Sequence, residues 1–149
     1  MNLVIMLYFR FMFTHQIRQA ITAAFNHSMD KQARVDNPNL TELERFEGAL
    51  KILIGENGLT IISENDLNHA LGSAERGHFA RRNKPARNGA MLTGEQAAHA
   101  NEVVYSILDI FQGIGAFNNG NGMIDLSVTL IRLKDAELRR ELENKFSRL

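Results

Sequence analysis

Apolar side chains recur at three- and four-residue steps along most of the chain, which is the spacing of one face of an α-helix. The pattern predicts helices over residues 14–29, 41–55, 63–72, 93–112 and 125–149, the last with room for a break at Asp135. Polar or glycine-rich connections are expected at residues 30–38, 72–92 and 113–122. The predicted fold class is all-α, a compact bundle of five or six helices in a single domain over residues 1–149.

Residues at the predicted helix starts favour these boundaries. Thr41 with Glu44, and Thr93 with Gln96, match the capping box, in which two side chains satisfy the free N–H groups of a first helical turn. Asp125 can cap the last helix. Short extended segments are expected just before two of the helices, at residues 59–62 and 123–124.

Residues 1–13 are almost wholly apolar and leave three interpretations open. The run is too short for a membrane span, and it lacks the basic leader and the cleavage site of a signal peptide. A core helix or strand is the favoured interpretation. The others are that translation starts at Met12, or that the run docks on a partner.

A protein partner or a homodimer is expected, because the run carries more apolar side chains than one helix face can bury. The last predicted helix also ends in an apolar seam, where few neighbours are expected within the chain. The candidate partner-binding residues are Leu7, Phe9, Phe11, Phe13, Leu142, Phe146 and Leu149.

Composition removes several classes of function. The 17 basic and 17 acidic residues cancel, so there is no overall attraction to nucleic acid or to an anionic membrane. The chain has no cysteine, which excludes disulfides, thiolate zinc sites, iron–sulfur clusters and cysteine nucleophiles. No cofactor is predicted. A cytoplasmic location fits the lack of a recognisable signal peptide, but a chain without disulfides is permitted in any compartment.

Residues 49–71 and 105–133 share one order of features: a helix, a polar or glycine turn, an isoleucine, a capping residue and a second helix. In this order, and in the segment NNGNGMIDL, the chain resembles the EF-hand family. That resemblance implies two loops with oxygen ligands at alternate positions, a turn glycine, and isoleucines that pair between the loops. It therefore implies a short two-strand bridge between Ile62 and Ile124.

The resemblance carries over as shape and not as calcium chemistry. In the second loop it assigns ligand positions to Asn119, Asn121 and Asp125, which are weak metal candidates, and the turn to Gly122. Phe117 and Val128 stand where the two outer carboxylates belong.

In the first loop the resemblance assigns ligand positions to Asn57, Ser63 and Asp66. Leu59 occupies a further ligand position and Thr60 the glycine position. We therefore expect no tight calcium binding, because the number of charged ligands tunes the affinity.

Residues 72–92 form a basic loop, with one acid among its charges. Such a cluster with an aromatic residue can bind phosphate or stack on a base. The candidate anion-binding residues are Arg76, His78, Arg81, Arg82, Lys84 and Arg87.

No phosphate-binding loop, nucleophile elbow or zinc-protease motif is present, so an enzyme is disfavoured, although a small hydrolase with unrecognised residues stays open. The function that we expect is a protein-interaction or scaffold module. The alternative is an anion- or nucleic-acid-binding protein that uses the basic loop.

Overall fold

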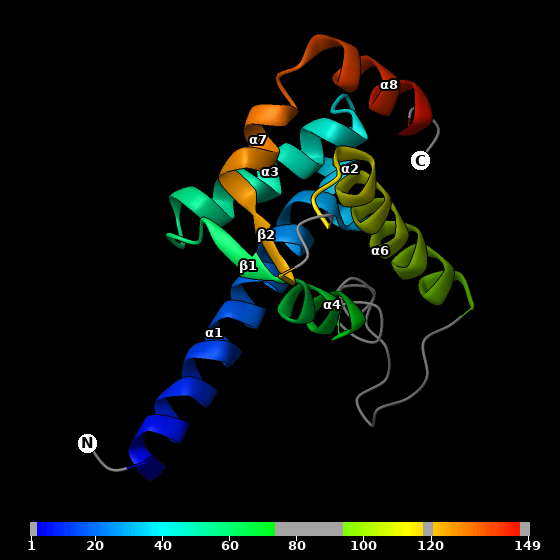
Figure 1. The fold of residues 1–149 in the computed structure, drawn as a ribbon. Helices are drawn as coiled ribbons and strands as arrows, with labels where there is room; N and C mark the ends of the chain where they lie inside the picture. Colours follow the sequence, from blue (N-terminus) through cyan, green and yellow to red (C-terminus); the bar gives the residue numbers. More distant parts are fainter. Residues whose placement is uncertain (1–2, 74–93, 118–120, 147–149) are drawn as a thin grey trace.

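The computed structural model describes residues 3–73, 94–117 and 121–146, with side chains described for residues 13–72, 102–117 and 121–146. In chain order (Figure 1) the elements are α1 (Leu3–Met29), α2 (Lys31–Asp36), α3 (Glu42–Gly55), β1 (Ile61–Ser63), α4 (Glu64–Ser73), α6 (Gly94–Ile114), β2 (Met123–Asp125), α7 (Leu126–Arg132) and α8 (Ala136–Phe146). The predicted all-α fold with a short two-strand bridge is confirmed.

Several helices begin at the capping residues that the sequence indicates. Thr41 Oγ1 accepts the Glu44 N–H at 3.2 Å, and Glu44 Oε1 accepts the Thr41 N–H at 2.9 Å, so the capping box of α3 is present. Asp135 Oδ1 accepts the Leu138 N–H at 3.0 Å and caps α8, which accounts for the break between α7 and α8.

A six-residue helix corrects the prediction for residues 30–38, which the sequence indicated as a polar connection. This helix, α2, starts because the Asp30 carboxylate accepts the Ala33 N–H at 2.8 Å. It ends at Asn37, before Pro38, which lacks the N–H that a helix needs.

The core is centred on three phenylalanines that come from three helices. Phe25 of α1, Phe46 of α3 and Phe111 of α6 are each fully buried. The Phe46 and Phe111 ring centroids lie 4.8 Å apart, edge to face, and the Phe25 centroid lies 6.1 and 6.4 Å from them. Truncating one such ring to alanine typically costs about 3–5 kcal/mol, so this cluster fixes how α1, α3 and α6 pack.

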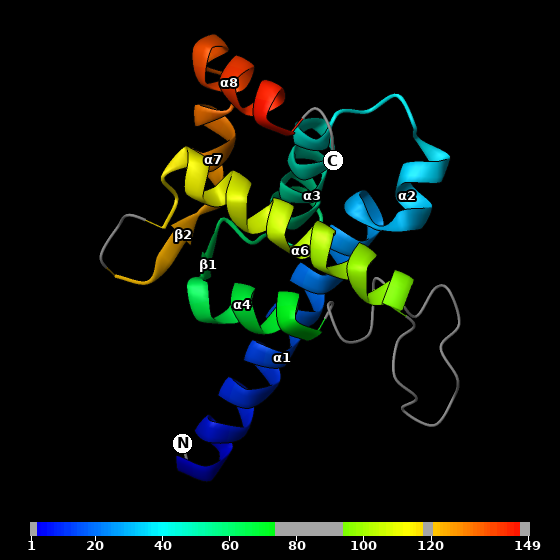
Figure 2. The same ribbon diagram turned by 90° about the vertical axis from the view of Figure 1, so that its right-hand side faces the viewer.

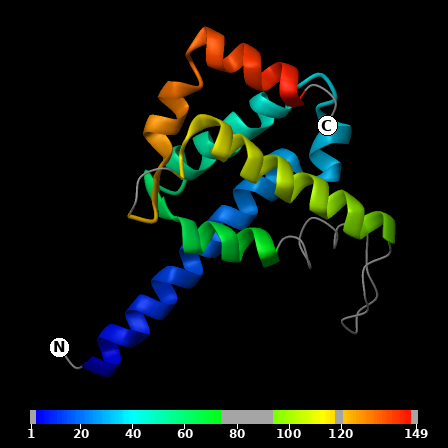
Figure 3. The same cartoon turned by 45° about the vertical axis from the view of Figure 1, so that its right-hand side comes forward.

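The longest described helix, α1, spans two segments that the sequence predicts as separate elements. The apolar run and the helix predicted at residues 14–29 form one helix, α1, about 40 Å long at 1.5 Å per residue. Its C-terminal half packs mainly against α3 and α4, whereas its N-terminal half projects away from the other described elements in all three views (Figures 1, 2 and 3). Of the favoured interpretation of residues 1–13, the helix is present over residues 3–13, but these turns project from the bundle and do not lie at its centre.

Candidate functional site

The two helix–loop–helix units, α3–β1–α4 and α6–β2–α7, meet at the antiparallel bridge between β1 and β2. Ile62 pairs with Ile124 at its centre, as the sequence predicts, and both side chains are buried. The Glu64 N–H donates to the Gly122 carbonyl, and the Leu126 N–H donates to the Thr60 carbonyl, each at 2.8 Å. In both hydrogen bonds the donor lies two residues after the isoleucine of its own strand, and the acceptor lies two residues before the isoleucine of the paired strand. The bridge therefore has local two-fold symmetry.

Both units begin their second helix with the same capping contact. In the first unit, Ser63 Oγ accepts the Asp66 N–H at 2.9 Å, and in the second, Asp125 Oδ1 accepts the Val128 N–H at 3.0 Å. Gly122 has a positive φ of 71°, as expected for the turn residue. In the first loop Thr60 stands at that place, and the positive φ of 67° falls on Gly58 instead.

Apolar side chains stand at several positions to which the EF-hand resemblance would assign ligands. Phe117 stands where the first carboxylate of the second loop would be, and its ring packs edge to face on Phe111 at 5.9 Å. Leu59, at a position to which the resemblance would assign a ligand in the first loop, packs against the core. Val128 stands at the closing position of the second loop and is 40% exposed.

Three of the oxygen-bearing side chains in the loops, those of Asp66, Asn121 and Asp125, accept hydrogen bonds within the chain. The closing acid of the first loop, Asp66, accepts a hydrogen bond from Arg18 Nε of α1 at 2.8 Å. Asn121 Oδ1 accepts the Met123 N–H at 3.0 Å, and Asp125 caps α7. Asn119 lies outside the described residues. Among the residues that the structure describes, no cluster of three or more histidine, aspartate or glutamate side chains could hold a metal ion.

A buried polar network at the other end of α3, around Glu42 and Arg45 of its first turn, was not predicted from the sequence. The Glu42 carboxylate accepts hydrogen bonds from both terminal nitrogens of Arg34, at 2.7 and 2.6 Å, and from the Ser106 hydroxyl at 3.1 Å. It therefore links α2, α3 and α6. Arg45 is also buried and donates to the carbonyls of Ala33 and Asn37 at the end of α2.

Burial lowers the pKa of Arg45, and the neighbouring Arg34 charge lowers it further, whereas Glu42 and Glu44 act in the opposite direction. The sequence does contain a signal for this network. Glu42 and Arg45 fall on the same helical face as Phe46 and Ala49 of the apolar stripe, where charged residues are expected only as partners of other groups.

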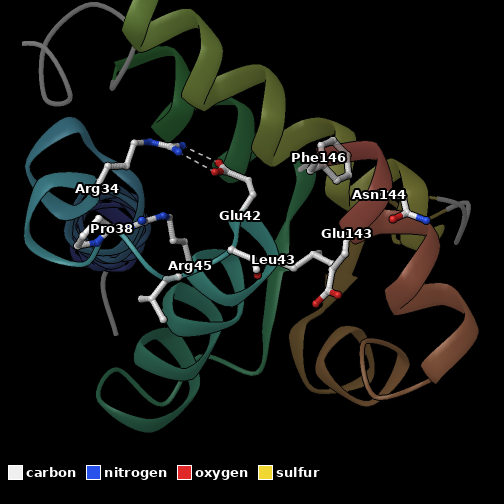
Figure 4. Close-up of a pocket in the computed structure, with 10 residues that line it drawn as sticks. Arg34, Pro38, Glu42, Leu43, Arg45, Glu143, Asn144 and Phe146 are labelled. Atoms are coloured by element: carbon white, nitrogen blue, oxygen red, sulfur yellow. Dashed lines mark hydrogen bonds and ion pairs between the residues drawn. The ribbon is translucent and has the colours of Figure 1, made fainter. Parts of the chain in front are cut away.

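Next to this network lies a hollow of about 560 Å³ between the start of α3 and the end of α8 (Figure 4). Figure 4 shows Arg34 and Glu42 joined to each other on one wall, and Phe146 and Asn144 on the other. The Arg34 Nε atom is buried and has no hydrogen-bond partner within the part of the chain that the structure describes. Arg34, Glu42 and Arg45 of this hollow hold α2, α3 and α6 together, so the geometry favours a structural role.

The structure separates the candidate partner-binding residues into two groups. Leu142 and Phe146 are 3% and 4% exposed, so these two residues of the α8 seam pack within the chain. This corrects the expectation for the C-terminal seam. Phe13 is 63% exposed on α1.

The structure does not describe the side chains of the other candidate residues. The side chains of Leu7, Phe9 and Phe11 are not among those described, and Leu149 lies outside the described residues. The whole basic cluster, Arg76, His78, Arg81, Arg82, Lys84 and Arg87, also lies outside them.

Comparisons with protein-family models, with curated proteins and with solved structures found no match to this chain. No helix within the described ranges is long and apolar enough to cross a membrane.

Proposed function

We propose that this chain is a protein-interaction module, built on an EF-hand-like pair of helix–loop–helix units, whose docking element is the N-terminal half of α1. The observation that carries the proposal is the division of α1. Ile21, Phe25 and Met29 at its C-terminal end are fully buried, whereas the apolar turns at its other end stand away from the described elements.

The C-terminal half of α1 already fills the surface that such a pair would offer to a helical ligand. An amphipathic helix typically binds a helical pair through apolar anchors spaced by three and four residues, and Ile17, Ile21 and Phe25 have this spacing. Arg18 fastens α1 to Asp66 of α4. An external partner therefore needs a different surface, and the apolar N-terminal half supplies one.

The symmetric backbone bridge and its two matched caps support the EF-hand-like part of the proposal. Tight calcium binding is not part of it, because Phe117, Leu59 and the Arg18–Asp66 ion pair occupy the places of ligands.

The test replaces Leu7, Phe9, Phe11 and Phe13 together by serine. Association of the full chain, with itself or with proteins of its native source, is measured by sedimentation and chemical cross-linking. We expect the variant to lose association while it keeps its melting temperature. The matched control, Val35→Ser with Ile131→Ser, changes two apolar residues that are 66% and 64% exposed and should associate normally. A variant that unfolds would show that these residues belong to the core, and unchanged association would place the docking surface elsewhere.

A further inference from the structure

We propose that the partner of α1 is α1 of a second copy of this chain, packed antiparallel with Gln16 at the two-fold axis. The inference rests on the proposed function, because it names the occupant of the same docking element. It uses one face of α1 that the core covers only in part, at Ala20.

Residues spaced alternately by three and four define this face, which we call the α1 seam. Phe13, Gln16, Ala20, Ala23 and His27 follow the spacing, which keeps a row of residues on one side of a helix facing a partner helix. Phe13 is 63% exposed; Gln16, Ala23 and His27 are exposed and Ala20 is half-buried. Positions 9 and 6 continue the same spacing toward the N-terminus.

The two ends of the seam are complementary in size, and this points to a second copy as the occupant. The N-terminal positions carry Met6, Phe9 and Phe13, and the C-terminal positions carry Ala20 and Ala23. In an antiparallel pair centred on Gln16, Phe13 meets Ala20 and Phe9 meets Ala23 of the other copy, so both phenylalanines face an alanine, and Met6 meets His27 at the outer end of the seam. Alternation of large and small side chains is what lets two helices pack closely.

A hollow is already present where the large residues would be received. It has a volume of about 390 Å³ and lies between α1 and the end of α3, lined by Ala20, Ala23 and Ala24 together with Ile52. Because the pairing is two-fold, each copy offers one hollow and one set of large residues, and the assembly closes as a dimer.

Charge complementarity supports the same arrangement. Arg10 is the only charged residue among residues 3–13, and Glu56 is the only carboxylate among the described residues that line the hollow. Position 10 shares a flank of α1 with Ile17 and Ala24, since the three are seven residues apart, and Ala24 lines the hollow together with Ile52 and Glu56 of the α3 end. A two-fold axis preserves the flank, so Arg10 of one copy faces Glu56 of the other.

The expected interface has the size that a stable dimer needs. Two phenylalanines at about 150–250 Å² each, with Met6 and the alanines, provide most of the roughly 800 Å² per partner of a standard interface.

The decisive experiment uses single cysteines, since the natural chain has none. With Gln16→Cys the two thiols meet at the two-fold axis, so mild oxidation should convert most of the full chain to a disulfide-linked dimer. Gln19→Cys is the matched control, because residue 19 is exposed but lies off the seam, and it should remain largely monomeric under denaturing conditions. Equal cross-linking of both variants, or of neither, would overturn the antiparallel pairing.

A charge exchange tests the register independently. Arg10→Glu and Glu56→Arg, each alone, should weaken dimerisation at least ten-fold in sedimentation equilibrium, and the two together should restore it. A double variant as weak as the worse single variant would overturn the Arg10–Glu56 contact and the register with it.

Two further outcomes separate this inference from the proposed function. A full chain that stays monomeric at tens of micromolar, yet binds another protein only when Leu7, Phe9, Phe11 and Phe13 are intact, would overturn the dimer and leave the docking element. Binding of the monomer to phosphatidylcholine vesicles through the same residues would show that they bind a lipid surface. It would overturn both the dimer and the protein-docking role of α1.

Discussion

The two helix–loop–helix units have the same backbone at the bridge but are held in place by different side chains. In the first unit, Asp66 is tied to α1 through Arg18, and Leu59 packs down into the core. In the second unit, Phe117 packs on Phe111, and Arg132 donates to the Ile114 carbonyl at 3.1 Å, which fastens the end of α7 to the end of α6. The comparison teaches that the symmetric geometry comes from backbone pairing and helix caps, whereas each loop has its own anchor.

The largest effect is expected at the centre of the bridge. Ile62→Ala and Ile124→Ala should each lower the free energy of unfolding by about 2–5 kcal/mol, because both side chains are buried. Since the two residues pair directly, a double-mutant cycle should give a coupling energy of about 0.5–3 kcal/mol.

The control for the bridge is Ile61→Ala on its outer face, where the side chain is 50% exposed, and its effect should stay within about 0.5 kcal/mol. Urea unfolding measures all of these values. A loss of unfolding free energy at only one of the two isoleucines would contradict the two-fold symmetry of the bridge.

The bridge and the caps could be predicted because each depends on residues close together in the sequence. An isoleucine followed by Ser63 or Asp125 is a local pattern, and so is Thr41 with Glu44. The Glu42–Ser106 contact spans 64 positions and leaves no local pattern.

The continuity of α1 was missed for a different reason. A run that is apolar at nearly every position has no three- and four-residue spacing from which its element can be read, so residues 1–13 could not be joined to the helix after them. Likewise, the burial of Leu142 depends on α6, where a β-carbon added at Gly113 would lie 2.8 Å from Leu142 Cδ2. Nothing near Leu142 in the sequence shows which helix covers it.

Introducing the two outer carboxylates that an EF-hand loop would require should sharpen the difference between the loops. Phe117→Asp with Val128→Glu should lower stability by about 2 kcal/mol without calcium, because the half-buried Phe117 ring is lost. The same variant should bind calcium with a dissociation constant on the order of 10⁻⁴–10⁻³ M by calorimetry, whereas the natural chain should show no binding in that range.

The matched change in the first loop is Gly55→Asp, which places a carboxylate at the start of that loop. It should gain no calcium affinity, because Asp66 is held by Arg18 and Leu59 fills a ligand position. If Gly55→Asp bound calcium as well as the second-loop variant, the assignment of different anchors to the two loops would be wrong.

The loss of stability on replacing Asp66, in the second helix of the first unit, or Asp125, which caps the second helix of the second unit, should depend differently on salt. Asp66→Ala removes a partly exposed ion pair and should cost about 1 kcal/mol, most of which disappears in 1 M salt. Asp125→Ala removes a cap and should cost about 1 kcal/mol with little salt dependence. Asp125→Ser should be nearly neutral, since serine caps the equivalent helix of the first unit. Thermal unfolding at low and high salt measures both, and equal salt responses would contradict the two roles.

The smallest effect is expected in the capping box of α3, where the first unit alone carries a titratable group. Hydrogen bonds from the backbone and the hydroxyl group of Thr41 hold the pKa of Glu44 below its usual value of 4.5. A carboxyl group whose pKa is lowered by folding stabilises the protein above its unfolded pKa, and this contribution is lost as the pH falls through the lower, folded value. The predicted capping box of α6 has Gln96 at the same place, and this residue does not titrate.

Glu44→Gln should therefore cost less than the roughly 1 kcal/mol of a lost cap at pH 7, because glutamine still accepts the Thr41 N–H. Urea unfolding of the natural chain and the variant between pH 7 and pH 3 should show the difference shrinking as the pH falls below about 4.5. A difference that persisted or grew in acid would mean that the ionised form of Glu44 does not stabilise α3.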